Sequence, residues 1–110
     1  MPDEFIVVLI TAPSQQAGEA IARTLVESRL AACVNILPAV RSIYAWEGAI
    51  QSDEEVLLLA KSRSGLFADQ LLPAVKAAHP YELPEIIALP IRMGLPGYLD
   101  WINEATSPVA

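Results

Sequence analysis

The spacing of hydrophobic residues changes along this chain, and each spacing predicts a strand or a helix. Residues 5–12, FIVVLITA, form an unbroken apolar and β-branched run, which is typical of a buried strand. Pro13 ends the run, and the Ser14 hydroxyl can accept a hydrogen bond from the first turn of a helix. Residues 15–30 predict that helix, because their apolar residues recur at helical spacing. These residues are Ala17, Ile21, Leu25, Val26 and Leu30.

The middle of the chain predicts two further strands and a turn. Residues 31–37 alternate with a period of two, Pro38 interrupts them, and residues 40–46 continue as a strand. Residues 47–54, EGAIQSDE, are mostly polar or small and predict the turn. Residues 55–61, EVLLLAK, are apolar at successive positions, so the strand that they form should be apolar on both faces.

A second helix and a last strand follow. Residues 65–78 predict the helix, with Ser64 as its cap, and Pro73 should kink it or restart it. Residues 86–91, IIALPI, predict the strand, and Pro90 indicates that its end lies at a sheet edge.

The element order predicts the fold class. GLPGYLDWI, residues 94–102, starts a short terminal helix, and TSPVA, residues 106–110, should be a loose tail. The order β-α-β-β-α-β with right-handed crossovers gives a ferredoxin-like α+β sandwich in which both helices cover one face of the sheet. We expect residues 1–110 to form one domain.

One face of this sheet should need a cover. Residues 56–60 and 86–89 are apolar on both faces, but the two helices can cover only one, and Tyr44 and Trp46 add aromatic surface. An exposed apolar face of this extent favours association. We therefore predict a homo-oligomer whose sheets pack against each other.

Composition narrows the class of protein. Thirteen acidic residues against seven basic ones give a net charge of −6, whereas nucleic-acid binders usually present a basic face. No apolar stretch is long enough to span a membrane, and the acidic start, MPDE, is unlike a secretory signal. The single cysteine, Cys33, excludes an internal disulfide. These features predict a soluble cytoplasmic protein that binds neither nucleic acid nor membranes.

Several separated motifs carry a family resemblance. LVESRLAACVNILPAVRSIYAWEGAIQSDEEVLLLAKS, HPYELPEIIALPI and YLDWI occur in this order between Thr11 and Ile102. In this pattern the chain resembles the CutA family of divalent-cation tolerance proteins. The resemblance implies a ferredoxin-like fold, a compact homotrimer and similarity in fold to the PII signalling proteins. It also implies a role in tolerance of copper and other divalent cations.

The ligands of copper-binding family members are only partly present. Those members have a cysteine before Thr-Ala-Pro, where this chain has Ile10, and a His-His pair before Pro-Tyr, where it has Ala78 and His79. Of three such ligands only His79 remains. The resemblance therefore implies a weak metal site at most, with copper as the first candidate.

His79 lies in HPYELPE, residues 79–85, which Pro80 and Pro84 should make a rigid corner. It is either a metal ligand or general base helped by Glu82 or Glu85, or a helix-ending residue that contacts the last carbonyls. The sequence leaves both interpretations open.

Cys33 and Lys61 also have two interpretations each. The Cys33 thiolate suits soft metals, but a lone cysteine is usually a small buried hydrophobe. Lys61 emerges from an apolar strand and could line a cleft for a small anion, or its ammonium could simply reach solvent at the sheet rim. We predict His79 and Cys33 as metal ligands. The ligand cleft predicted between subunits contains Trp46, Lys61, Tyr81 and Glu85.

Nothing in the sequence indicates an enzyme. The five glycines do not form a phosphate loop, no nucleophile elbow is present, and one histidine supplies too few ligands for catalytic zinc. We expect no obligatory cofactor. The leading hypothesis is a homotrimer that acts in divalent-metal tolerance and binds metal weakly. The alternative is a PII-like trimer that binds a small molecule or a protein partner and has no physiological metal.

Overall fold

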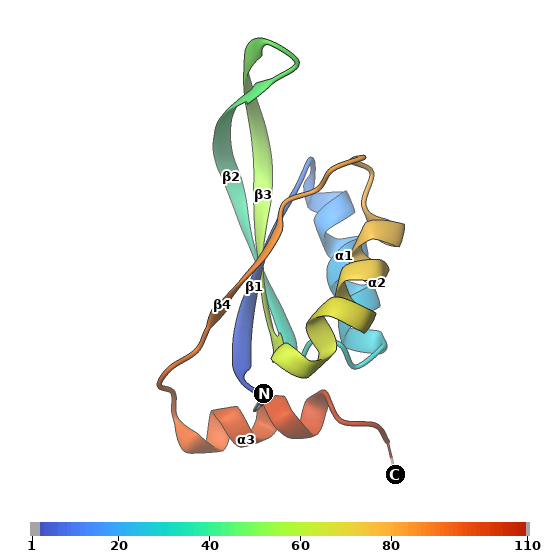
Figure 1. Cartoon of the computed structure of the whole chain (residues 1–110), viewed down its shortest axis with the longest axis vertical. Helices are drawn as coiled ribbons and strands as arrows, with labels where there is room; N and C mark the ends of the chain where they lie inside the picture. Colours follow the sequence, from blue (N-terminus) through green and yellow to red (C-terminus); the bar gives the residue numbers. More distant parts are fainter. Residues whose placement is uncertain (1–2, 110) are drawn as a thin grey trace.

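The computed structural model describes residues 3–109; Met1, Pro2 and the last residue of the predicted tail, Ala110, lie outside it. Its helices and strands are β1 (Phe5–Ala12), α1 (Gln15–Glu27), β2 (Cys33–Trp46), β3 (Ala49–Arg63), α2 (Leu72–Ala78), β4 (Ile86–Pro90) and α3 (Pro96–Ala105). The four strands form an antiparallel sheet in the order β2-β3-β1-β4 (Figure 1). This arrangement confirms the ferredoxin-like α+β fold with its terminal helix.

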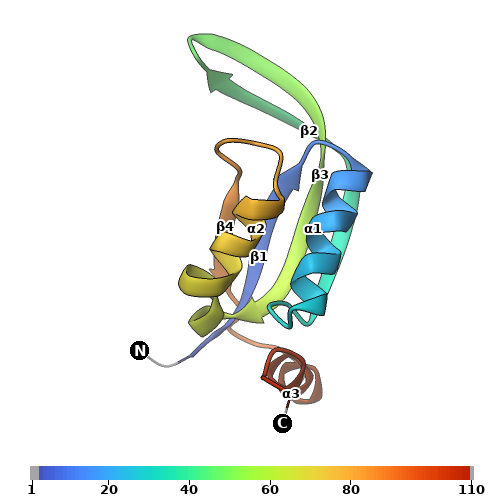
Figure 2. The same cartoon turned by 90° about the vertical axis from the view of Figure 1, so that its right-hand side faces the viewer.

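The core lies between the sheet and the helices α1 and α2, which cover the same face (Figure 2). Alternate residues of β1 and β3 point into this layer and meet the apolar faces of the two helices. The fully buried apolar side chains there include Val8, Ile10, Ile21, Leu25, Leu58, Leu71 and Val75. At Gly18 the helix α1 approaches β3 so closely that an added Cβ would lie 2.9 Å from Cγ2 of Val56.

Helix α1 begins as predicted and ends early. The Ser14 hydroxyl accepts a hydrogen bond from the Ala17 amide at 3.1 Å, which confirms the cap. The helix ends at Glu27 rather than at residue 30, because Arg29 takes a left-handed backbone with φ of 61°. The amide of Leu30 then bonds back into the last turn, which closes the helix.

The β2–β3 hairpin is much longer than predicted. The turn predicted over residues 47–54 is wrong: it consists of Glu47 and Gly48 alone, both with positive φ, and the rest is strand. Pro38 does not break β2 but accompanies a register shift between Leu37 and Val40. Residues 40–55 therefore form a two-stranded extension, the hairpin arm, which projects beyond the helices (Figure 1).

The second helical segment is divided at its proline. A 3₁₀ turn (Ser64–Leu66) and a π-helical turn (Phe67–Leu71) precede α2, and Pro73 lies in the first turn of α2. Pro73 thus restarts the helix as predicted. The predicted cap at Ser64 is wrong, since its hydroxyl accepts a hydrogen bond from the Glu4 amide instead. Strand β4 ends at Pro90 on the sheet edge, which confirms the edge prediction.

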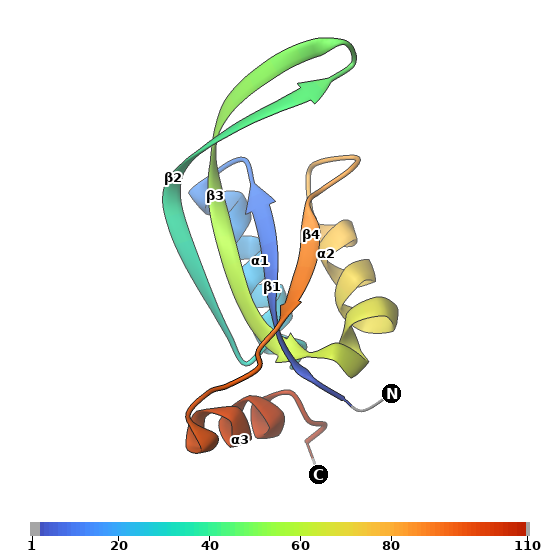
Figure 3. The same cartoon turned by 60° about the vertical axis from the view of Figure 1, so that its left-hand side comes forward.

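The second face of the sheet is apolar, and among residues 3–109 the only helix that approaches it is α3, at the end near Cys33. Figure 3 shows the sheet with α1 behind it, and α3 lies at the end of the sheet opposite the hairpin arm. Ile87 and Leu89 are each 51% exposed there. The apolar side chains of this open face are Val7, Leu9, Leu37, Leu57, Leu59, Ile87 and Leu89.

Candidate functional site

His79 ties the end of α2 to the end of β1. Its Nε2 lies 2.7 Å from the carbonyl oxygen of Thr11, and its Nδ1 accepts a hydrogen bond from the Tyr81 amide at 3.1 Å. A neutral imidazole with its proton on Nε2 satisfies both contacts. The side chain is buried, and it contacts β1. The expectation that His79 contacts the last carbonyls of the second helix is therefore wrong.

Tyr81 extends this connection to β3. Its ring packs against the imidazole of His79 with centroids 4.8 Å apart, and its hydroxyl donates to Oε2 of Glu55 at 2.8 Å. Burial raises the pKa of the Tyr81 hydroxyl, and the hydrogen bond to the Glu55 carboxylate raises it further. The loop of residues 79–85 is therefore fixed to two strands of the sheet by side-chain hydrogen bonds.

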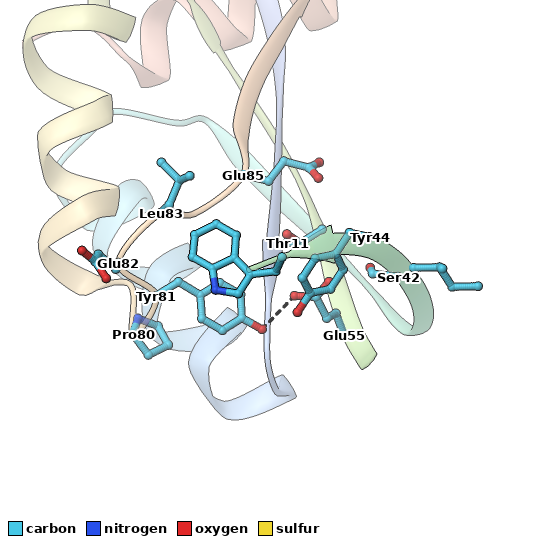
Figure 4. Close-up of a pocket in the computed structure, with 11 residues that line it drawn as sticks. Thr11, Ser42, Tyr44, Glu55, Pro80, Tyr81, Glu82, Leu83 and Glu85 are labelled. Atoms are coloured by element: carbon cyan, nitrogen blue, oxygen red, sulfur yellow. Dashed lines mark hydrogen bonds between the residues drawn. The ribbon is translucent and has the colours of Figure 1, made fainter. Parts of the chain in front are cut away.

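A cleft of about 700 Å³ opens between this loop and the hairpin arm (Figure 4). Tyr81 reaches into it from the loop, and Tyr44 and Trp46 line it from the arm. The pKa of the Tyr44 hydroxyl is raised, first by its hydrogen bond to the Asp53 carboxylate. The full lining is Thr11, Ser42, Ile43, Tyr44, Trp46, Glu55, Pro80, Tyr81, Glu82, Leu83 and Glu85.

Three of the four predicted cleft residues line this space. They are Trp46, Tyr81 and Glu85. Lys61 does not: its Nζ donates to Oδ1 of Asn35, near the other end of the sheet. The two places are separated along β1: Thr11 lines the cleft, whereas Val7 pairs with Lys61. Val7 lies four residues from Thr11, or about 13 Å along the strand. Lys61 is therefore not part of this cleft within one chain, and the predicted cleft between subunits stays a prediction.

Cys33 also lies at the far end. It pairs with Lys61 across β2 and β3, and the Tyr98 hydroxyl of α3 lies close to its thiol. Burial raises the pKa of the Tyr98 hydroxyl, and its contact with Cys33 adds to the shift. His79 and Cys33 therefore do not form one ligand set within a chain. Nor do residues 3–109 contain any group of three His, Cys, Asp or Glu residues arranged to hold a metal ion.

Glu55 is a charged cleft residue that the sequence pattern does not single out. It is only 7% exposed, and in the sequence it opens the run 55–61, which predicts a strand. A carboxylate at the head of an otherwise apolar strand was the available signal, because a buried acid needs a donor. That donor is Tyr81.

Comparison with known proteins identifies the family. A sequence model of the family described as CutA1 divalent ion tolerance protein matches residues 6–105. The chain belongs to the CutA1 family. The sequence resemblance is thereby confirmed, as is the association of this family with tolerance of divalent cations.

Individual CutA1 relatives differ in length. The divalent-cation tolerance protein CutA of Thermus thermophilus is 54% identical over 91% of this chain and 96% of its own length. The chloroplastic protein CutA of Arabidopsis thaliana is 48% identical over 92% of this chain, which spans just over half of that protein, 55%. The structure of the periplasmic divalent cation tolerance protein CutA from Archaeoglobus fulgidus superposes with a TM-score of 0.90 at 45% identity, covering 94% of this chain and 99% of that one. In the part of this chain that the structure describes, no helix is long and apolar enough to cross a membrane.

Proposed function

We propose that this CutA1-family protein acts in divalent-cation tolerance as a cytoplasmic homotrimer that binds divalent metal weakly, with copper as the first candidate. The observation that carries the proposal is the open face of the sheet. Ile87 and Leu89 are half exposed on it, and Ile50 of the hairpin arm is 74% exposed. Surfaces of this kind mark an interface.

The assembly follows from the cost of leaving this surface in water. Each fully buried large aliphatic side chain contributes about 1.5–3 kcal/mol, and the open face and the arm together present many such residues. Other copies of the same chain offer a matching surface, since a closed assembly repeats one contact. The resemblance seen in the sequence favours three copies.

Weak metal binding agrees with the surroundings of His79. Both ring nitrogens already have hydrogen-bond partners, so a metal ion must displace one of them. Glu82 and Glu85 are exposed on the same loop and would supply hard oxygen ligands. A net charge of −6 on each chain also attracts cations to the surface. Tolerance would then arise by buffering or sensing, with no catalytic step.

Two measurements on one preparation test the proposal. Sedimentation velocity should give a trimer, and calorimetric titration of copper(II) and zinc into metal-free protein should give weak saturable binding. Binding should be lost in His79→Ala and kept in Glu27→Gln, which removes an exposed acid on α1. A monomer at all concentrations would refute the assembly, and metal binding that His79→Ala leaves unchanged would refute the site.

A second candidate function is favoured by the cleft itself. Its volume of about 700 Å³ lies within the range typical of small-molecule sites, and far exceeds what a metal ion occupies. The alternative is therefore a PII-like trimer that binds a small molecule and has no physiological metal. Copper and zinc titrations without saturable binding, on a protein that still sediments as a trimer, would favour this candidate.

A further inference from the structure

Glu55 is a buried carboxylate with one oxygen that has no hydrogen-bond partner in the described part of the chain. The residue is 7% exposed, and Tyr81 donates to Oε2. Among residues 3–109 no donor forms a hydrogen bond with Oε1. In the same residues, every side-chain oxygen that is fully shielded from solvent has a hydrogen-bond partner. Oε1 must therefore retain access to open space. Because Glu55 lines the cleft, that space is the cleft.

The charge of Glu55 has no cation beside it. Within the described residues, the ion pairs are Arg41 with Glu54 and Arg63 with Asp3. The cleft lining contains three glutamates and neither lysine nor arginine. A buried charge is costly unless an opposite charge or further donors complete it. The cleft therefore lacks a positive group, which a ligand would supply.

The aromatic residues of the cleft specify the kind of cation. Tyr44, Trp46 and Tyr81 all line it, and the faces of such rings attract ammonium groups. Ile43 and Leu83 add apolar surface for the body of a ligand. A bare divalent ion would use neither the rings nor this surface.

We propose that this cleft binds a small organic cation, an ammonium group carried on an apolar or aromatic body. The ammonium lies against Oε1 of Glu55 and a ring face, and the body fills the space beside Leu83. This inference rests on the second candidate function and names its ligand class. Its charge is opposite to that of the small anion expected beside Lys61, a residue that lies near the other end of the sheet.

A charged and a neutral probe of equal shape test the class of ligand. Phenethylammonium carries the positive charge at neutral pH, and phenethyl alcohol has a hydroxyl in its place. Calorimetric titration should give saturable binding of the ammonium, with the alcohol weaker by about tenfold or more, because only the ammonium neutralises Glu55. Equal binding of the two probes, or binding of neither, would overturn the proposal.

A pair of adjacent substitutions tests the residue. Glu55→Gln removes the charge but keeps an oxygen for Tyr81, and should weaken ammonium binding by about tenfold or more. Glu54→Gln makes the same change one residue earlier, where the side chain is 68% exposed and paired with Arg41, and should leave binding unchanged. If both variants bind as the wild type does, Glu55 is not the partner and the proposal fails.

A third variant covers the case in which Glu55→Gln does not fold. Trp46→Leu alters a side chain that is 45% exposed on the hairpin arm and absent from the core, and should weaken ammonium binding by about threefold or more. Unchanged binding in this variant would overturn the role of the rings.

Sedimentation of the same samples separates this inference from the proposed function. A trimer that binds copper but not phenethylammonium would refute the organic cation alone. A protein that binds phenethylammonium through Glu55 but is monomeric would support the cation site and refute the proposed assembly.

Discussion

A single charged substitution on the open face should dissociate the proposed trimer into monomers. Ile87 lies on the edge strand β4, opposite Leu9 of β1, and is 51% exposed in one chain. We choose Ile87→Glu because the side chain lies outside the core layer between sheet and helices. The substitution should therefore leave the fold of each chain intact.

The magnitude follows from the exposed half of the side chain. Fully burying an isoleucine contributes about 1.5–3 kcal/mol, so burying the remaining half in an interface contributes about 1 kcal/mol per copy. Loss of this apolar contribution in three copies weakens the assembly less than the buried charge does. A carboxylate sealed in the same place without a partner costs several kcal/mol more per copy, so the assembly constant should fall by about a thousandfold or more.

The assay is sedimentation velocity at micromolar protein, with circular dichroism to monitor folding. Ile87→Glu should sediment as a folded monomer, and Ile87→Ala should form a weakened assembly. Met93→Glu adds the same charge at a side chain that is 88% exposed beyond β4, and should sediment as the wild type does. If folded Ile87→Glu protein sediments like the wild type, the open face is not the interface.

Three further predictions concern stability. The melting temperature should rise with protein concentration, since unfolding is linked to dissociation; a reversible melt that is independent of concentration would contradict the assembly. Gly18→Val should lower stability by about 1–3 kcal/mol, because its Cβ would already lie 2.9 Å from Val56 and 3.2 Å from Leu58; thermal melts at one fixed concentration measure this. Tyr81→Phe should cost about 1–3 kcal/mol at neutral pH by leaving Glu55 without its donor. The raised pKa of Tyr81 makes its contribution complete below pH 10.0, its ordinary pKa, and lost as pH rises further, so the difference between wild type and Tyr81→Phe should shrink in strongly alkaline melts.

The layers of the fold were predictable from local signals. Period-two and helical spacing predict the strands and helices. The cap follows from the Ser14 hydroxyl, which accepts from a free amide, and the restart follows from Pro73, whose nitrogen has no N–H to donate. The hairpin arm was missed for a physical reason. Residues 49–54 are mostly polar or exposed because both faces of the arm lie outside the core of the chain, and such a strand has the composition of a turn.

The site was harder to predict because it depends on distance along the strands. Alternation places Lys61 and Glu55 on the same face of β3, so sequence alone could group either with the aromatic residues. Only the register decides: Glu55 pairs with Val40 at the base of the arm, while Lys61 pairs with Cys33 at the far end. A cleft that contains Lys61 would favour an anionic ligand, whereas a cleft that contains Glu55 favours a cationic one.

The contacts of His79 change what its substitution can reveal. The imidazole holds Thr11 and the Tyr81 amide, and Tyr81 in turn holds Glu55. His79→Ala therefore removes a candidate ligand and also loosens one wall of the cleft, so loss of binding in that variant has two causes. Glu55→Gln with Glu54→Gln as its control changes one charge while the oxygen that Tyr81 needs remains. This pair of variants therefore tests the charge of Glu55 while the hydrogen bonds that hold the cleft wall remain. Substitution of His79 removes a candidate ligand and those hydrogen bonds together.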